Sequence, residues 1–194
     1  MRAAALRRVV CAPPQNRAWR RARASAADAE TGPCVVTFRG REIEADSEVT
    51  LRSALLLSGL TPHNSGARAI NCRGIGSCGT CAVECIPQSA VSPEERTRAE
   101  KIRLNLPPHG EPGNRRLRLA CQVRVRASCE VVKRDKFWGE GEGVMGALPA
   151  EGTAEAAEAE GGPFFGIAEY ALDPAAMRIA RARARSNDDG QIDG

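Results

Sequence analysis

Three cysteines lie together in a glycine-rich segment, residues 71–81, and a fourth follows far along the chain. The three are Cys72, Cys78 and Cys81, spaced C-x5-C-x2-C, and the fourth is Cys121 in the apolar sequence Leu-Ala-Cys-Gln. Four cysteine thiolates are the ligand set that holds a [2Fe–2S] cluster. The spacing therefore predicts a single bound [2Fe–2S] cluster and, with it, the transfer of single electrons.

The glycines between these cysteines fit the same chemistry. Gly74, Gly76 and Gly79 let the backbone pass close to a cluster and point its N–H groups inward, where any Cβ would obstruct the approach. Cys78 and Cys81 are near enough in sequence to share one iron region. The fourth cysteine is expected to close the site from another strand.

This part of the chain resembles the plant-type [2Fe–2S] ferredoxins over residues 34–138, most closely at residues 72–81 and 118–122. The resemblance implies that the cluster ligands are Cys72, Cys78, Cys81 and Cys121. It also places Arg73 where many of those proteins have an arginine after the first ligand.

The loop departs from the plant-type pattern in its length. The usual spacing is C-x4-C-x2-C, and this loop has one more residue between the first two cysteines. Five intervening residues are found in adrenodoxin-like ferredoxins, but the flanking Cys-Arg-Gly and Cys-Gly-Thr-Cys are more similar to plastid proteins. The chain is most similar to divergent ferredoxin-like proteins of chloroplasts, and the departure leaves its partner and reduction potential open.

Other uses of four cysteines fit less well. A structural zinc site usually pairs two C-x2-C units, and the chain has one. A domain built on disulfides would usually be smaller and poorer in core. A Rieske centre needs paired Cys-His motifs, whereas His63 and His109 each adjoin a proline, so no ligand role is expected for them.

The remaining cysteines are expected to be structural. On a strand, Cys85 would lie about 13 Å from Cys81 at roughly 3.3 Å per residue, too far to bind the same cluster. Its position predicts an inward-facing core thiol, and Cys34 and Cys129 are expected to be strand residues of the same kind. Cys11 falls in the N-terminal segment.

Charge divides the chain into three segments. Residues 1–33 carry a formal charge of +5, residues 34–138 carry +6 and residues 139–194 carry −7, within the total of +4. Only the middle segment has the apolar periodicity needed for a core, and its length is sufficient to fold alone. It is the expected [2Fe–2S] ferredoxin-type domain.

The flanking segments predict no core of their own. Residues 1–33 are rich in Arg and Ala with no acid before Asp28, which is typical of an organellar transit peptide and linker. With the resemblance, this favours the chloroplast (the stroma or the stromal face of a complex), with the mitochondrion as the alternative. Residues 139–194 are rich in Gly, Ala and Glu and predict a mostly disordered tail with a short basic helix over 175–185. No apolar run approaches the roughly 18 residues of a membrane span.

The middle segment predicts an α+β fold. The expected elements are a hairpin of residues 34–38 and 41–45, a helix over 50–60 capped within 46–48, a strand over 81–86, a helix beginning at 92–95, and strands over 118–125 and 130–133. This order is that of a β-grasp (ubiquitin-like) ferredoxin fold, with disordered N- and C-terminal extensions.

The positive charge of residues 34–138 predicts the surface charge of the redox partner. Photosynthetic ferredoxins as a family are acidic and dock onto basic patches, whereas like-charged surfaces slow the encounter. The expected partner is therefore a redox protein or complex with an acidic docking surface. The basic residues expected near the fourth ligand are Arg115, Arg116, Arg118, Arg124, Arg126, Lys133, Arg134 and Lys136. Nucleic acid is not expected, because the chain lacks an aromatic stacking platform.

Two functions remain open on the sequence. The first is a small one-electron carrier. The alternative is an iron–sulfur subunit anchored in a larger plastid complex, where the cluster has a structural, regulatory or relay role. An enzyme is not expected, because no acid–base pair, nucleophile motif or flavin site accompanies the cysteines.

Overall fold

The computed structural model describes residues 34–149. Its strands are β1 (Cys34–Phe38), β2 (Arg41–Ala45), β3 (Ala82–Ile86), β4 (Val91–Ser92), β5 (Leu117–Leu119), β6 (Arg124–Val125) and β7 (Cys129–Val132). Its α-helices are α1 (Leu51–Leu57) and α2 (Arg98–Arg103), and its 3-10 helices are η2 (Ser65–Arg68), η3 (Gln88–Ala90) and η4 (Gly113–Arg116).

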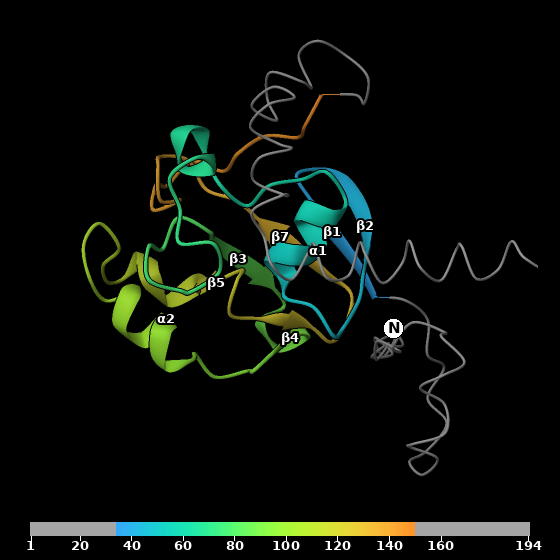
Figure 1. Ribbon diagram of the computed structural model, residues 1–194, viewed down its shortest axis with the longest axis horizontal. Coiled ribbons are helices and arrows are strands. Elements are labelled where there is room, and N and C mark those ends of the chain that lie inside the picture. Colours follow the sequence, from blue (N-terminus) through green and yellow to red (C-terminus); the bar gives the residue numbers. More distant parts are fainter. Residues whose placement is uncertain (1–33, 150–194) are drawn as a thin grey trace, which may run out of the picture.

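The main sheet has five strands in the order β2-β1-β7-β3-β5 (Figure 1). β1 and β2 form the expected antiparallel hairpin, whose turn is Arg39-Gly40, and β7 lies parallel to β1. β3 pairs antiparallel with both β7 and β5. A mixed sheet with few helices is the expected α+β β-grasp architecture.

Alternating burial along β1 shows which face of the sheet packs on the core. Cys34, Val36 and Phe38 are buried and the residues between them are half-buried, as a strand with one covered face requires. They pack in one apolar cluster with Leu51 and Leu55 of α1. This single core supports both α1 and β3, the strand that follows the cysteine loop.

Helix α1 begins later than the sequence predicted. The expected cap within residues 46–48 is wrong, because Thr50 caps the helix by accepting a hydrogen bond from the Ser53 backbone N–H at 3.2 Å. The helix ends at Leu57, before Gly59, rather than at residue 60. Thr50 leaves its own backbone extended while its hydroxyl satisfies the helix N-terminus, which is the role of an N-cap.

Helix α2 also begins later, at Arg98 rather than within residues 92–95. Thr97 and Glu100 form a reciprocal capping box, in which each side chain accepts a hydrogen bond from the other residue's backbone. Ser92 is instead part of β4. The sequence contains Ser/Thr-x-x-Glu twice, at Ser92 and at Thr97, and the second one starts the helix.

The strand expected over residues 118–125 is divided in two. β5 ends at Leu119 and belongs to the main sheet, whereas β6 begins at Arg124 and pairs with β4. A turn separates them, closed by a 2.8 Å hydrogen bond from the Gln122 N–H to the Leu119 carbonyl. Cys121 therefore lies in a turn rather than on a strand.

The packed structure continues past the expected domain boundary at residue 138. The Met145 N–H donates to the Lys133 carbonyl at 2.8 Å, and the Leu148 N–H donates to the Arg39 carbonyl at 2.9 Å. Leu148 also packs against the core. The domain thus includes residues 139–149, which were expected to belong to the tail.

The expected transit peptide and the helix over 175–185 lie outside the described residues. Between residues 34 and 149, no helix has the length and apolar composition that crossing a membrane requires.

Candidate metal centre

The four cysteines of the predicted ligand set come together as two pairs. The Sγ atoms of Cys72 and Cys78 are 3.2 Å apart, and those of Cys81 and Cys121 are 3.5 Å apart. Two sulfurs bound to one tetrahedral metal at about 2.3 Å would be about 3.8 Å apart. Each pair thus has the spacing of two thiolates on one iron, and two such pairs fit the two irons of a [2Fe–2S] cluster.

This pairing differs from the one that sequence proximity suggested. Cys78 was expected to share an iron region with Cys81, but it pairs with Cys72 instead. Gly79, at φ +78°, turns the chain between Cys78 and Cys81, so proximity along the chain does not bring their thiols together. Cys81 pairs with the cysteine most distant in sequence, and the centre therefore joins two parts of the fold.

Hydrogen-bond donors surround the sulfurs. The Cys72 backbone N–H donates to Cys78 Sγ at 3.4 Å, and the Gln122 side-chain amide donates to Cys121 Sγ at 3.5 Å. The pKa of Cys72 falls to about 3, first because the Cys78 thiol donates to it and then through backbone N–H groups of Cys78, Gly76 and Ser77, while burial opposes the shift. The same thiol contact raises the pKa of Cys78, so the backbone and side-chain N–H donors are the groups that stabilise anionic sulfur here.

Two of the three loop glycines are required by close packing. A Cβ on Gly76 would lie 2.9 Å from the Gln122 amide nitrogen and 3.1 Å from Ala99 Cβ, and one on Gly79 would lie 2.9 Å from Arg103 Nε and from His109 Cε1. Gly74 has nothing within 4 Å. At two positions a Cβ would therefore meet neighbouring side chains that hold the loop in place, whereas the predicted obstruction of the cluster stays a prediction.

Helix α1 positions the turn that carries Cys121. The backbone N–H groups of Leu51 and Arg52, at the start of the helix, donate to the carbonyls of Val123 and Ala120 at 2.8 and 2.9 Å. These N–H groups have no partner inside the helix, because the first turn of any helix leaves its donors unsatisfied. The helix N-terminus thereby fixes the carbonyls on either side of the Cys121-Gln122 pair.

A buried chain of hydrogen bonds ends on Cys78. Arg52 Nε donates to His63 Nε2 at 3.4 Å, His63 Nδ1 lies 2.9 Å from the Thr80 hydroxyl, and that hydroxyl lies 3.1 Å from Cys78 Sγ. Because His63 Nε2 accepts, its ring proton is assigned to Nδ1, which donates to Thr80 and leaves the Thr80 hydroxyl to donate to the sulfur. Burial, with the nearby charges of Lys133 and Arg52, lowers the pKa of His63 well below its usual value, so the ring stays neutral.

His63 is thus a residue of the site that the sequence did not identify. Its ring bonds to the Thr80 hydroxyl, which in turn contacts Cys78 Sγ. A buried histidine seventeen residues before its partner gives no local signal.

Replacing Thr80 with valine is expected to lower the reduction potential of the bound cluster. Valine keeps the shape but removes the hydroxyl that donates to Cys78, and hydrogen bonds to cluster sulfurs raise the potential. Both redox states make this hydrogen bond. The shift in reduction potential should therefore correspond to less than the about 1.5–3 kcal/mol of a hydrogen bond to a charged group. A redox titration checks this, and Thr80→Ser, which keeps the hydroxyl, should leave the potential unchanged.

The other cysteines of the described segment are core residues. Cys85 on β3 and Cys129 on β7 are buried, and Cys34 on β1 is also buried. Burial raises the pKa of Cys85 to about 12 and that of Cys129 to about 11. The prediction of inward-facing strand residues is confirmed for all three.

The basic residues expected near the fourth ligand do not form one exposed patch. Arg118 and Lys133 are fully buried, and Arg118 forms an ion pair with Glu100 at 3.0 Å. Three others have acidic partners: Arg116 and Arg134 approach Glu84, and Arg115 approaches Glu111. Of the expected set, Arg115, Arg124, Arg126 and Lys136 are exposed, and Arg115 is the one of these four that pairs with a carboxylate among the described residues.

Helix α2 also brings positive charge to the cysteine loop. Arg103 donates to the Cys78 carbonyl at 2.9 Å, and Ala99 faces Gly76, so this helix packs directly on the loop (Figure 1). Arg98 and Lys101 on the same helix are exposed. The sequence could not show this, because the contact depends on how α2 packs.

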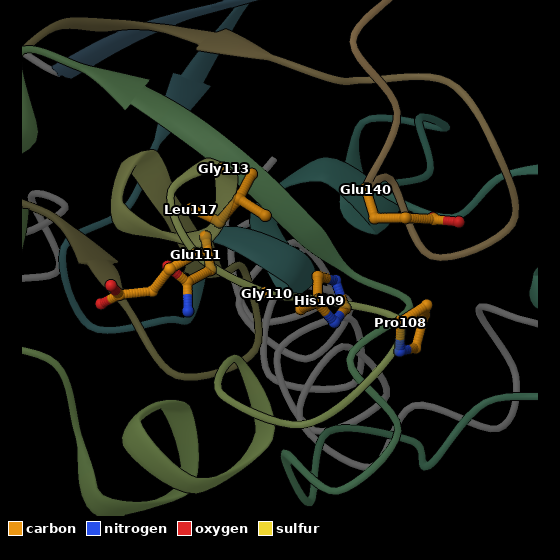
Figure 2. Close-up of a pocket in the computed structure, with 8 residues that line it drawn as sticks. Pro108, His109, Gly110, Glu111, Gly113, Leu117 and Glu140 are labelled. Atoms are coloured by element: carbon orange, nitrogen blue, oxygen red, sulfur yellow. The ribbon is translucent and has the colours of Figure 1, made fainter.

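A surface pocket is lined in part by His109, whose ring also lies against Gly79 of the cysteine loop. It encloses about 250 Å³ and is lined by residues of the 108–117 segment and by Glu140. Figure 2 shows the side chains of Glu111 and Glu140 pointing away from His109 in opposite directions. The His109 ring packs on Gly79 and contacts the Trp138 carbonyl at 3.3 Å, which fits a role in holding the loop.

Comparison with known families agrees with this geometry. Residues 36–126 match the model of the 2Fe-2S iron-sulfur cluster binding domain. Neither the comparison with curated proteins nor the comparison with solved structures gives a match. The matched segment contains both sulfur pairs and the elements that position them. Residues 36–126 therefore agree with a 2Fe-2S iron-sulfur cluster binding domain both in the family match and in the geometry of the four cysteines.

Proposed function

We propose that this protein carries single electrons on one [2Fe–2S] cluster bound by Cys72, Cys78, Cys81 and Cys121. The observation that supports the ligand set is the pair of Sγ–Sγ distances, 3.2 and 3.5 Å, within a segment that matches a cluster-binding family. A bound cluster accepts and releases one electron. The protein supplies the donors around the sulfurs and the buried surroundings that set the potential.

Anaerobic purification of the full chain tests this proposal. Absorption and EPR spectra are recorded before and after reduction with dithionite, together with iron and sulfide content. We expect a brown protein with two irons and two sulfides per chain, as a [2Fe–2S] cluster requires, and a one-electron rhombic signal on reduction. A colourless protein that contains zinc would contradict the proposal.

Thiol labelling provides a second, independent check of the ligand set. In the native holoprotein, an alkylating reagent at neutral pH should leave Cys72, Cys78 and Cys121 unlabelled, and chelation of the iron should expose them. Cys85 and Cys129 should stay unlabelled in both states, because they are buried and their pKa values are raised to about 12 and about 11. Mass spectrometry of the peptides identifies each site, and labelling of Cys72 at full rate in the holoprotein would argue against its role.

We further propose a plant-type protein of the chloroplast, with residues 1–33 as its transit peptide. The Cys-Arg-Gly and Cys-Gly-Thr-Cys sequences and the Arg- and Ala-rich N-terminal segment support this. Fusion of residues 1–33 to a fluorescent protein tests it: plastid import is expected, and mitochondrial import would favour the alternative.

The partner is proposed to have an acidic docking surface that meets α2 and the cysteine loop. Arg98, Lys101 and Arg103 bring positive charge to this face. Complementary charge speeds association, and salt screens it. The rate of electron transfer to an acidic partner should therefore fall as salt rises, whereas faster transfer at high salt would contradict the proposal.

The alternative, an iron–sulfur subunit anchored in a larger complex, is supported by exposed apolar residues in the cysteine loop and on α2. Ile75 in the loop and Ile102 on α2 are 76% and 55% exposed. Exposed apolar side chains beside a functional site are typical of an interface. Stable co-purification with a complex would favour this role, and a monomer with reversible one-electron chemistry would favour the carrier.

A further inference from the structure

Lys133, on the segment that follows β7, is a buried cation beside the cysteine loop. Its side chain is 1% exposed, although lysine is almost never fully buried without a partner. Its Nζ donates to the Thr80 carbonyl at 3.1 Å and to the Ala82 carbonyl at 2.9 Å. These two carbonyls flank Cys81, so the ammonium group is held against the backbone of a proposed ligand.

Gly139 closes the space above this ammonium group. A Cβ there would lie 2.8 Å from Lys133 Nζ and 3.0 Å from the Ala82 carbonyl oxygen, and the residue has φ +73°. The chain therefore passes directly over the charge and excludes solvent from it. A charge in a water-excluded environment acts more strongly on its neighbours than an exposed one.

No carboxylate forms an ion pair with Lys133 among the described residues, although Glu140 acts on it electrostatically. Burial lowers the pKa of Lys133 to about 8, whereas the sulfurs of Cys81 and Cys78, with Glu140, act in the opposite direction. The sulfurs of the proposed centre are thus among the negative groups that offset the cost of this buried charge.

We propose that Lys133 is a positioning residue of the centre, whose fixed positive charge raises the reduction potential of the cluster bound by the four cysteines. The inference rests on the proposed function. A reduced cluster carries one more negative charge than an oxidised one, so a nearby fixed cation stabilises the reduced form more. Lys133 lies outside residues 36–126, and the family match therefore does not include it.

Neutral replacements of Lys133 in the full holoprotein test the proposal. Lys133→Met removes the charge and the donors, and Lys133→Gln removes the charge but keeps an N–H donor. At a fixed electrode potential, each should lower the ratio of reduced to oxidised cluster at least tenfold, which is about 59 mV for one electron. Lys133→Arg keeps the charge and should restore most of the shift.

Lys136→Met is the matched control, because it removes a lysine three positions away that is exposed. Its ratio should change less than about twofold, since salt and water screen exposed charges. A purely structural role for Lys133 predicts a different pattern, in which Gln preserves the potential and only Met alters it. That pattern would overturn the proposal, as would unchanged potentials in both neutral variants.

Absorption spectra separate this inference from the proposed function. A wild-type chain that binds no cluster would contradict the proposed function itself, whereas wild-type spectra with unshifted potentials in the variants contradict only the role of Lys133. If both neutral variants fail to retain the cluster, the Gly139→Ala variant tests the proposal instead, because its methyl group displaces the Lys133 ammonium group. A lower potential in that variant is expected, and an unchanged one would overturn the proposal.

Discussion

Replacement of Cys121 with alanine is expected to abolish cluster binding. The substitution leaves Cys81 without the sulfur that lies 3.5 Å away, and no other thiol is available in the turn between β5 and β6. Loss of an outer partner of a metal ligand typically costs 10–100-fold in affinity, so loss of a ligand should cost more than about 100-fold. Iron and sulfide content per chain, with the visible absorption spectrum, measures the result.

Cys129→Ala is the control for this experiment. Cys129 is also a buried cysteine, but it lies on β7 and faces the core. Its replacement should cost about 1 kcal/mol of stability, as for a small loss of buried volume, and leave iron content unchanged. Full iron content in Cys121→Ala, or loss of iron in Cys129→Ala, would contradict the proposed ligand set.

Replacement of Glu100 with alanine is expected to cause the largest loss of stability. Its carboxylate is fully buried and accepts hydrogen bonds from Arg118 Nε at 3.0 Å, from the Leu119 N–H at 2.9 Å and from the Thr97 N–H at 2.8 Å. Without it the buried Arg118 guanidinium loses its partner, and breaking a buried pair in this way costs about 3–5 kcal/mol. Urea unfolding of the full chain should show a lower midpoint with an unchanged slope.

The matched control is Glu95→Gln, which alters a carboxylate that forms a surface ion pair with α2. Glu95 is 90% exposed and lies 3.8 Å from Lys101, so its pair is a surface one. Its loss should change the free energy of unfolding by at most about 0.5 kcal/mol. A similar small change for Glu100→Ala would show that the Glu100–Arg118 pair does not join α2 to β5 as described.

The sequence predicted the elements with strong local signals. The hairpin of residues 34–45 has its predicted limits, because Arg39-Gly40 is a turn signal between two β-rich runs. The start of α2 was misplaced, since both Ser92 and Thr97 precede a glutamate by three positions. Glu100 also binds Arg118 and Leu119, and this tertiary contact stabilises the second start, which a local pattern cannot reveal.

For the site as well, the sequence predicted the features that have a local signal and missed those that depend on packing. The spacing of the cysteines and the family match both indicate a [2Fe–2S] site. The pairing of Cys81 with Cys121, and the approach of His63 through Thr80, depend on strand order and helix packing and have no local signature. Lys133 was expected among the basic residues near the fourth ligand, and only the structure shows that it is buried, with its ammonium group on the Thr80 and Ala82 carbonyls.

The position of β7 in the sheet determines the order in which the domain can be completed. β7 is the last strand of residues 34–149, yet it occupies the centre, between β1 and β3. On a ribosome that releases the N-terminus first, the β1–β2 hairpin and the β3–β5 pair emerge before the strand that joins them. All four cysteines of the centre are therefore synthesised before the sheet can close, and Lys133, which directly follows β7, is synthesised after them.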